Sequence, residues 1–209
     1  MNMNEKFFSL PKERQEAMIN AGFRVFSQNS YRKSPMSEIA EAAGVSKSLL
    51  FHYFRNKKEL YLFLWETGVG ITLDELEKSG CYEQEDLFET MYKGIEAKFR
   101  IMRQYPDLAA FVVKAFYEKD PAVCGEIQES IEKHGSFNAN AGMLNLDPEF
   151  FVPGLDLEMM YWDMYWASEG YIWEKLQRGK MDLEDVDQIE AEFMRLIDFW
   201  KSVYLRKEE

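Results

Sequence analysis

The sequence predicts an all-α protein, in which an N-terminal three-helix head containing a helix-turn-helix is followed by a larger helical body. Three observations lead to this expectation. Apolar residues recur at helical spacing along most of the 209-residue chain, and no run alternates long enough to indicate a sheet. Proline, glycine and serine stand where helices would begin and end. Charge also divides the chain into two unlike parts.

The first helix of the head is expected over residues 11–28, and Pro11 marks its start. Five small or apolar residues follow at offsets 0, 3, 4, 7 and 8, which places them on one helix face. They are Met18, Ala21, Gly22, Val25 and Phe26. The polar segment QNSYRKSP then ends the helix.

Two short helices are expected next. Ser37 is the predicted N-cap of the first, which ends at Gly44. Ser46 is the predicted N-cap of the second, which runs from Lys47 to about Arg55. The two helices and the tight turn between them form a helix-turn-helix.

The rest of the chain is expected to continue as helices. They are predicted over about residues 57–77, 84–104, 107–118, 120–135, 155–178 and 182–206. Residues 135–154 are rich in Gly, Asn and Pro, and we expect a loop there with a short turn of helix. We divide the chain into a helix-turn-helix domain, 1–56, and a body for effector binding and dimerisation, 57–209.

The charge division is hidden by the overall net charge of -12. Residues 1–60 hold ten Lys and Arg against six Asp and Glu, a net charge of +4. Residues 61–209 hold fifteen against thirty-one, a net charge of -16, so the two parts sum to -12. Only the N-terminal part is suited to phosphate groups.

The composition favours a folded protein, because 46% of the residues are hydrophobic and 15% are aromatic. No stretch approaches the ~18 consecutive apolar residues of a membrane span. The N-terminus has no long apolar region ahead of a cleavage site. We therefore expect a cytoplasmic protein without a membrane partner.

Cysteine and histidine are sparse. Cys81 and Cys124 lie far apart in sequence, as do His52 and His134, and no CxxC or HxxxH spacing occurs. We expect no zinc site, no cofactor and no disulfide. Two buried structural cysteines are the preferred interpretation, with a redox-sensing thiol as the alternative.

The second helix of the helix-turn-helix has two different faces. Leu50 and Phe54, four residues apart, are expected to pack inward, with Phe51 near the edge. The outward residues are Lys47, Ser48, Leu49, His52 and Tyr53. In such motifs the second helix enters the major groove of DNA and its N-terminal residues reach base edges.

The match extends beyond this spacing. The segment SPMSEIAEAAGVSKSLLFHYFRNKKEL resembles the DNA-binding head of the TetR-type (tetracycline-repressor-like) regulators, whose pattern is IAxxAGVSxGxLYxHFxxKxxL after a Thr or Ser. The order of one helix, the helix-turn-helix and a long fourth helix is also similar. The resemblance covers about residues 12–62, and beyond them it concerns architecture alone.

The resemblance implies a double-stranded DNA operator as partner and gives roles to residues by position. It places Ser37 and Lys57 on phosphates. It places Lys47, Ser48 and Leu49 nearest the bases, and His52 and Tyr53 on bases or backbone. Arg32 and Lys33 are further candidates for phosphate contacts.

Three residues depart from the family pattern. Ser48 stands where Gly is frequent, so a side chain projects toward the groove. Leu49 replaces a common Thr, which favours contact with a thymine methyl group. Phe51 replaces a common Tyr and lacks its hydroxyl, so it could belong to the core.

The last two helices predict a dimer. Apolar residues form a seam along the last helix at spacings of 3, 4, 3, 4 and 3, through Val186, Ile189, Phe193, Leu196, Trp200 and Val203. The preceding helix is apolar on most sides and must be covered on most sides. Pairing with a second copy gives a four-helix interface, as the resemblance implies. The predicted interface residues are Trp162, Trp166, Phe193, Leu196, Trp200 and Val203.

The resemblance also implies a cavity for a small-molecule effector within the body. The residues we predict to line it are Phe99, Tyr117, Tyr161, Trp162, Asp163, Tyr165 and Trp166. A carboxylate among aromatic rings would suit a cationic, lipophilic ligand. The alternative is that Asp163 is solvated or paired at the interface.

Together these expectations describe a homodimeric transcriptional repressor of a palindromic operator, released by a small lipophilic effector. The alternative is a DNA-binding protein regulated by a protein partner that docks on the acidic body. An enzyme is not expected, because the chain contains no GxSxG, no phosphate-binding loop and no HExxH.

Overall fold

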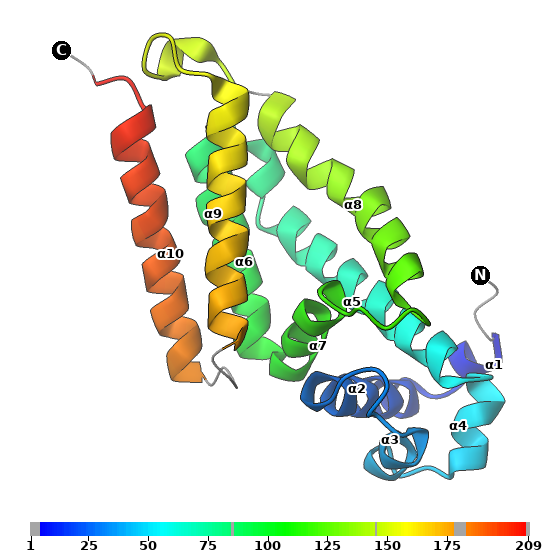
Figure 1. Cartoon of the computed structure of the whole chain (residues 1–209). Helices are drawn as coiled ribbons and strands as arrows, with labels where there is room; N and C mark the ends of the chain where they lie inside the picture. Colours follow the sequence, from blue (N-terminus) through cyan, green and yellow to red (C-terminus); the bar gives the residue numbers. More distant parts are fainter. Residues whose placement is uncertain (1–4, 85, 145, 178–182, 208–209) are drawn as a thin grey trace. The chain divides into compact units, whose positions relative to one another are not determined.

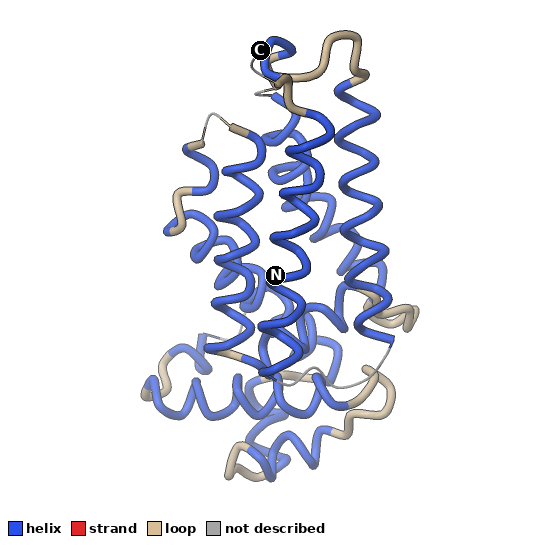
Figure 2. The backbone as a smooth tube through the Cα atoms, turned by 90° about the vertical axis from the view of Figure 1, so that its left-hand side faces the viewer, coloured by secondary structure: helices blue, strands red, loops and turns tan. Residues whose placement is uncertain are grey.

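A computed structural model gives the fold, and it describes residues 5–84, 86–144, 146–177 and 183–207. Its α-helices follow one another along the chain (Figures 1 and 2). They are α1 Glu5–Phe8, α2 Lys12–Gln28, α3 Met36–Ala42, α4 Lys47–Tyr53, α5 Lys57–Lys78, α6 Leu87–Gln104, α7 Pro106–Phe116, α8 Cys124–Leu144, α9 Leu157–Gln177 and α10 Leu183–Tyr204. Two 3-10 turns, Cys81–Glu83 and Pro148–Phe150, complete the described elements. The predicted all-α class is confirmed.

The predicted loop over residues 135–154 is wrong in its first half. Helix α8 continues through Gly135 to Leu144, and only the turn at Pro148–Phe150 matches the prediction. Gly and Asn lower helix propensity by about 1 kcal/mol or less per residue, which is too little to end a helix on its own. No proline interrupts the chain between residues 122 and 147, so nothing forces the break.

The chain forms two compact units. Unit 1 consists of Met1–Leu73 with Gln104–Gly135, and unit 2 consists of Asp74–Arg103 with Ser136–Glu209. This division differs from the expected boundary between residues 56 and 57. The reason is that the first part of α5 is buried within unit 1, through Leu60, Tyr61 and Leu64.

An aromatic cluster from three helices forms much of the core of unit 1. The ring of Phe111 in α7 lies 5.4 Å from that of Phe23 and 6.0 Å from that of Phe26, both in α2. Its centroid is 5.1 Å from that of Tyr61 in α5. Aromatic pairs at these separations are favourable beyond their burial. Residues after position 100 therefore help to hold the N-terminal helices.

Close approach and one buried hydrogen bond attach α5 to its neighbours. A Cβ atom at Gly22 would lie 2.5 Å from Cδ1 of Leu64, so any larger residue at this position would force the Leu64 side chain to shift. On α8, the buried hydroxyl of Ser130 accepts a hydrogen bond of 2.8 Å from the indole N–H of Trp65. The part of α5 around Leu64 and Trp65 thus contacts neighbours on two sides.

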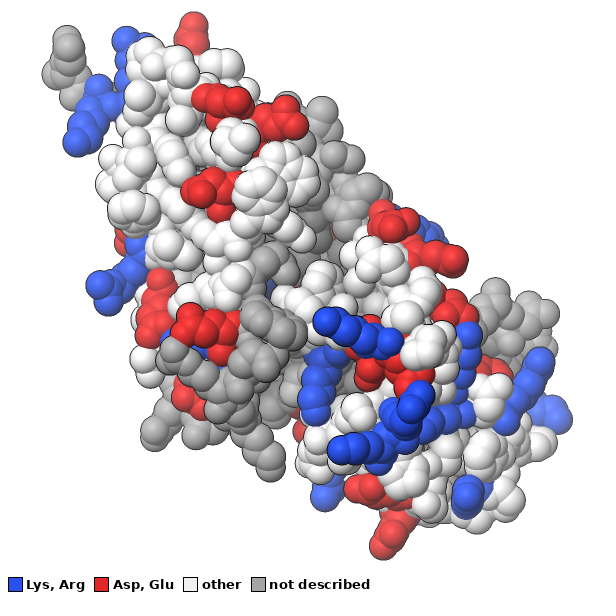
Figure 3. All heavy atoms as spheres, viewed as in Figure 1, with Lys and Arg blue, Asp and Glu red and all other residues white. Residues whose placement is uncertain are grey.

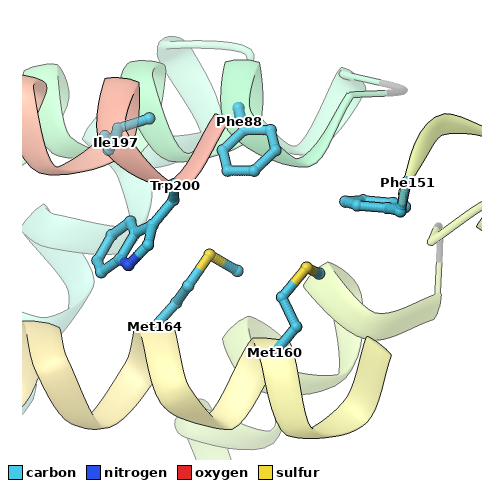
Figure 4. Close-up of a cluster of buried hydrophobic side chains, with 6 residues drawn as sticks. All are labelled: Phe88, Phe151, Met160, Met164, Ile197 and Trp200. Carbon is cyan, nitrogen blue, oxygen red and sulfur yellow. The ribbon is translucent and has the colours of Figure 1, made fainter. Parts of the chain in front are cut away.

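Unit 2 has its own core, formed by α6, α9, α10 and the segment before α9. Figure 4 shows Met164 of α9 pointing toward Trp200 of α10, and Met160 pointing toward the side where Phe88 of α6 lies. The full cluster of buried residues is Phe88, Phe151, Met160, Met164, Ile197 and Trp200. A second cluster joins Phe99 of α6 to Val186, Ile189 and Phe193 of α10.

Polar contacts join α10 and the residues after it to other parts of unit 2. Arg103 of α6 forms an ion pair with Asp187 of α10 at 2.7 Å and a second one with Glu190. The end of the chain is joined to the segment before α9, because Val152 N–H donates to the Tyr204 carbonyl at 2.9 Å. An isolated antiparallel bridge pairs Phe151 with Leu205.

Two properties of the described part of the chain bear on function. None of its helices combines the length and apolar character needed to cross a membrane. It also contains no group of three or more His, Cys, Asp or Glu placed to hold a metal ion. Of the two free cysteines, Cys81 is buried as expected, but Cys124 is only partly buried.

Candidate DNA interface

The helix-turn-helix forms within unit 1 from α3, a tight turn and α4. Gly44 takes a φ of 66°, a left-handed conformation that side chains disfavour, and its N–H donates to the Glu41 carbonyl at 3.0 Å. Val45 N–H donates to the Ala40 carbonyl at 2.9 Å. These bonds end α3 with the pattern of a glycine-terminated helix. The predicted role of Gly44 in the turn is confirmed.

The two predicted caps have different outcomes. Ser46 caps α4 as expected, because its side-chain oxygen accepts the backbone N–H of Leu49 at 3.1 Å. Ser37 does not cap α3, since that helix begins at Met36 and its N-cap is Pro35, two residues before Ser37. Ser37 instead lies exposed in the first turn, where a phosphate contact stays a prediction.

Helix α4 offers one face to solvent. Leu50 is fully buried and Phe54 is 4% exposed, so the predicted inward face is confirmed. Lys47, Ser48 and His52 are exposed. Leu49 and Phe51 are partly buried, and the Lys47 ammonium lies 5.9 Å from the centre of the Phe51 ring.

The expectation that Tyr53 faces outward is wrong. Tyr53 is 8% exposed, and its ring lies 6.0 Å from that of Phe7 in α1. The spacing of residues within α4 could not reveal this, because Tyr53 is covered by a helix from outside the motif. The Tyr53 ring therefore belongs to the core of unit 1 and not to the exposed face of α4.

Lys57, the predicted phosphate lysine, is held by the loop that precedes α3. Its ammonium donates to the Arg32 carbonyl at 3.2 Å and lies 4.6 Å from the centre of the Tyr31 ring. Burial there lowers the pKa of Lys57, and the neighbouring Asp120 carboxylate opposes the shift. An ammonium has three donors, so contact with a phosphate remains compatible with this geometry.

Acidic residues between α7 and α8 hold the same loop. The Glu118 carboxylate accepts the backbone N–H of Tyr31 at 3.0 Å. Asp120 accepts from Nε of Arg32 at 3.2 Å, although the Arg32 side chain remains 80% exposed. Next to Lys57, Lys58 of α5 forms an ion pair with Glu126 of α8. Sequence analysis missed these partners, because nothing local links residues 30–33 to residues 118–126.

The charge distribution agrees with a role for this surface. Lysine and arginine side chains gather over the head on the face shown in Figure 3, at the lower right of the view. Acidic residues dominate the rest of the sequence. A basic surface beside an exposed recognition helix is the electrostatic footprint of a DNA-binding protein.

The residues predicted to line an effector site differ in their burial, and their role stays a prediction. Phe99 is 2% exposed and belongs to the core of unit 2, where its ring lies 6.4 Å from that of Phe193. Tyr117 belongs to unit 1, whereas the other five residues lie on α9 in unit 2. Tyr165 and Trp166 are exposed. Helical spacing alone could not distinguish an inner from an outer face of α9.

The remaining α9 residues have individual surroundings. Tyr161 and Trp162 are partly buried, and Trp162 stacks on Trp166 with centroids 6.0 Å apart. Asp163 is exposed and accepts a hydrogen bond of 3.0 Å from the Tyr204 hydroxyl. This agrees with the alternative of a paired, solvated carboxylate.

The predicted dimer residues fall into three groups by their burial. Phe193 and Trp200 are 3% and 2% exposed, so they belong to the core of their own chain and not to an outer surface. Trp166 and Val203 are 59% and 45% exposed. Trp162 and Leu196 are partly buried. Met159 and Phe199, each 58% exposed, were missed by the sequence analysis.

The fold and this surface have the features of a helix-turn-helix DNA-binding protein. The sequence profile of the bacterial regulatory proteins of the tetR family matches residues 18–63. This match confirms the resemblance predicted from the motif around α3 and α4, and the proteins similar to the chain are transcriptional regulators and not enzymes.

Comparison with individual proteins gives the extent of the similarity. The activator FasR of Mycolicibacterium smegmatis is 26% identical over 130 residues, which cover 62% of this chain and 59% of FasR. The fatty acid metabolism regulator protein of Bacillus subtilis is 32% identical over 61 residues, covering 29% of this chain and 31% of that protein. The chain thus spans less than two thirds of the length of these curated relatives.

A solved structure supports the fold over the whole chain. The TetR family regulator from Chloroflexus aurantiacus superposes with a TM-score of 0.72, covering 97% of this chain and 98% of that one. Their sequence identity is 22%, so the similarity concerns the fold alone.

Lys57 and Leu49 are expected to respond differently to substitution. Lys57→Ala should weaken binding to all duplexes alike and reduce the salt dependence by up to about one unit of slope, since one phosphate contact is lost. Leu49→Ala should change the preference between sequences, because base contacts specify and phosphate contacts position. Titrations of selected and shuffled duplexes at several salt concentrations measure both effects.

Lys58→Ala is the matched control for Lys57. Its ammonium is paired with Glu126, so its removal should change the salt slope less. An unchanged slope for Lys57→Ala would count against a phosphate contact. A uniform loss for Leu49→Ala would give that residue a positioning role only.

Proposed function

We propose that the chain acts as a homodimer whose two heads bind a palindromic DNA operator, and that it represses transcription until a small apolar effector releases it. The main support for a homodimer is an exposed apolar face on the last two helices. The exposed face of α4 supports operator binding. The acidic body is unsuited to DNA, which leaves the head as the binding surface.

The apolar face, which we call the α9–α10 face, consists of Met159, Trp162 and Trp166 on α9 with Leu196, Phe199 and Val203 on α10. On each helix the three residues are spaced by three and four, so they form one stripe. Four of the six are at least 45% exposed. Patches of this kind on a soluble protein mark interaction sites. A second copy of the same face is a suitable partner, because a two-fold axis places identical patches against each other.

A dimer would also give the heads their geometry. Two recognition helices read half-sites one turn apart when they are separated by about 34–36 Å. Helix α5 passes from unit 1 into unit 2, so a change in the body can alter that separation. An effector that binds better to a conformation with wrongly spaced heads would release the DNA.

The proposed effector class is a compound with a long apolar chain, such as a fatty acid or its thioester. A similar protein is named a fatty acid metabolism regulator, and this supports the choice of class. The alternative remains a protein partner that docks on the acidic surface of the body. Insensitivity of DNA binding to every apolar compound would favour that alternative.

Selection from a random-sequence duplex library tests the proposal. The wild-type protein should enrich a palindrome, bind it with an even number of chains per duplex, and release it when oleate or oleoyl thioester is added. A reporter with the selected site across its promoter should lose expression when the protein is present. Enrichment of a sequence without internal symmetry would overturn the dimeric operator, and a rise in expression would make the protein an activator.

A further inference from the structure

Helix α1 lies outside the segment that matches the tetR family, which begins at residue 18. It is a single turn, and one of its two aromatic residues is fully engaged in the core. Phe7 is 1% exposed, whereas its neighbour Phe8 is 48% exposed. A four-residue helix has no stability of its own, so these contacts must hold it in place.

Phe7 fills a position between the end of the recognition helix and α5. Its ring lies 6.0 Å from that of Tyr53 at the end of α4 and 5.1 Å from that of Phe54, the C-cap of α4. On the other side it lies 5.3 Å from the ring of Phe63 in α5. Phe54 and Phe63 also contact each other, at 5.2 Å. Phe7 is therefore the member of this cluster that contacts both α4 and α5 from outside the motif.

Hydrogen bonds fix the segment that carries Phe7. The Gln15 side chain in α2 donates to the Phe8 carbonyl at 3.2 Å and to the Leu10 carbonyl at 2.8 Å. Leu10 N–H donates to the Phe7 carbonyl at 3.2 Å. The backbone that follows Phe7 is thus attached to α2.

Helix α4 needs such support because it is short. Seven residues span about 10 Å, and one buried residue in its middle, Leu50, cannot by itself prevent the helix from tilting. Contacts to base edges need donor–acceptor distances within a few tenths of an ångström. A second attachment at the C-terminal end, through Tyr53 and Phe54, fixes the direction of the helix axis.

We propose that α1 is a brace for the recognition helix and that Phe7 is a positioning residue for sequence-specific DNA binding. The brace acts through Tyr53 and Phe54 and touches no base itself. The inference rests on the proposed binding of a specific operator by the exposed face of α4. It extends the DNA-binding unit to residues that precede the family motif.

The pair Phe7→Ala and Phe8→Ala tests the brace, since the two residues are adjacent in the same helix. The probes are the duplex that the wild-type protein selects and a shuffled duplex of the same length. Phe7→Ala should lose about ten-fold or more in affinity for the selected duplex, comparable to a mismatched base pair, and less than two-fold for the shuffled one. Phe8→Ala should bind both duplexes like the wild type. Phe7→Leu should recover most of the loss, because leucine keeps an apolar side chain at the site.

Amide hydrogen exchange distinguishes positioning from general stability. In Phe7→Ala, exchange should accelerate in peptides covering 47–54 while peptides covering 36–42 remain as in the wild type. Faster exchange spread equally over α2 to α5 would overturn the inference, since Phe7 would then merely hold the unit together. An equal loss of affinity for both duplexes, or no difference between the two alanine variants, would also overturn it. If the wild type selects no sequence, the proposed function fails instead, and hydrogen exchange still decides whether α1 braces α4.

Discussion

Replacing Trp166 by glutamate is expected to turn the dimer into a monomer and to reduce affinity for the selected operator by about a hundred-fold or more. Trp166 is 59% exposed in one chain and is the last of the three α9 residues that belong to the α9–α10 face. Covering the exposed part of a tryptophan is worth roughly 2–4 kcal/mol at ~25 cal/mol per Å². Two-fold symmetry doubles the effect, and each new carboxylate would be desolvated without a partner.

The loss of operator affinity follows from the loss of one head. A dimer presents two linked recognition helices, and linkage raises the affinity for a two-site target by about 10²–10⁴ over that of one module. A monomeric variant should keep the weak, salt-dependent binding of a single head. Light scattering after size exclusion reports the mass, and titration of the selected duplex reports the affinity.

Tyr105→Glu is the matched control, because this aromatic residue is 44% exposed but lies in unit 1 at the start of α7. It should remain dimeric and bind the operator with nearly unchanged affinity. A Trp166→Glu protein with the mass and operator affinity of the wild type would rule out the α9–α10 face as the dimer interface.

Phe111→Ala is expected to lower the free energy of unfolding by about 3–5 kcal/mol, the range for truncating a fully buried phenylalanine. Phe111 has no exposed surface and contacts the rings of Phe23, Phe26 and Tyr61. Removing it leaves a cavity beneath the DNA-binding helices. The loss is large compared with the ~5–15 kcal/mol stability of an ordinary domain.

Phe116→Ala is its control on the same helix. Phe116 is 37% exposed, and its truncation should cost about 1 kcal/mol or less. Urea unfolding followed by far-ultraviolet circular dichroism measures both variants. Equal effects would mean that the contact of α7 with the head contributes little to the stability of unit 1.

The head could be predicted from sequence in most of its details, because local chemistry determines them. The Ser46 cap, the left-handed Gly44 and the inward Leu50 and Phe54 depend on neighbours within a few residues. Tyr53 could not be placed, because its partner Phe7 comes from a separate segment. Equally, no local signal joins the loop at Arg32 to Asp120, which lies 88 positions later.

The α9–α10 face shows a second limit of sequence reasoning. The predicted seam on α10 mixed two adjacent stripes, since Phe193 and Trp200 are buried while Val203 is exposed. Successive side chains on a helix are rotated by about 100° around its axis. A shift of one residue in the assigned pattern therefore moves a side chain from the core to the surface. Periodicity indicates which residues share a face, and only the packing of α6 against α10 decides which face is covered.

Unit 1 is built from two separate segments of the chain, and this affects how it folds during synthesis. Its core includes Phe111, which is synthesised 47 positions after Leu64. At about 5–20 residues per second, the recognition helix leaves the ribosome several seconds before the residues that complete its support. During that interval the nascent head has exposed aromatic side chains, and full DNA-binding competence must await the emergence of α7.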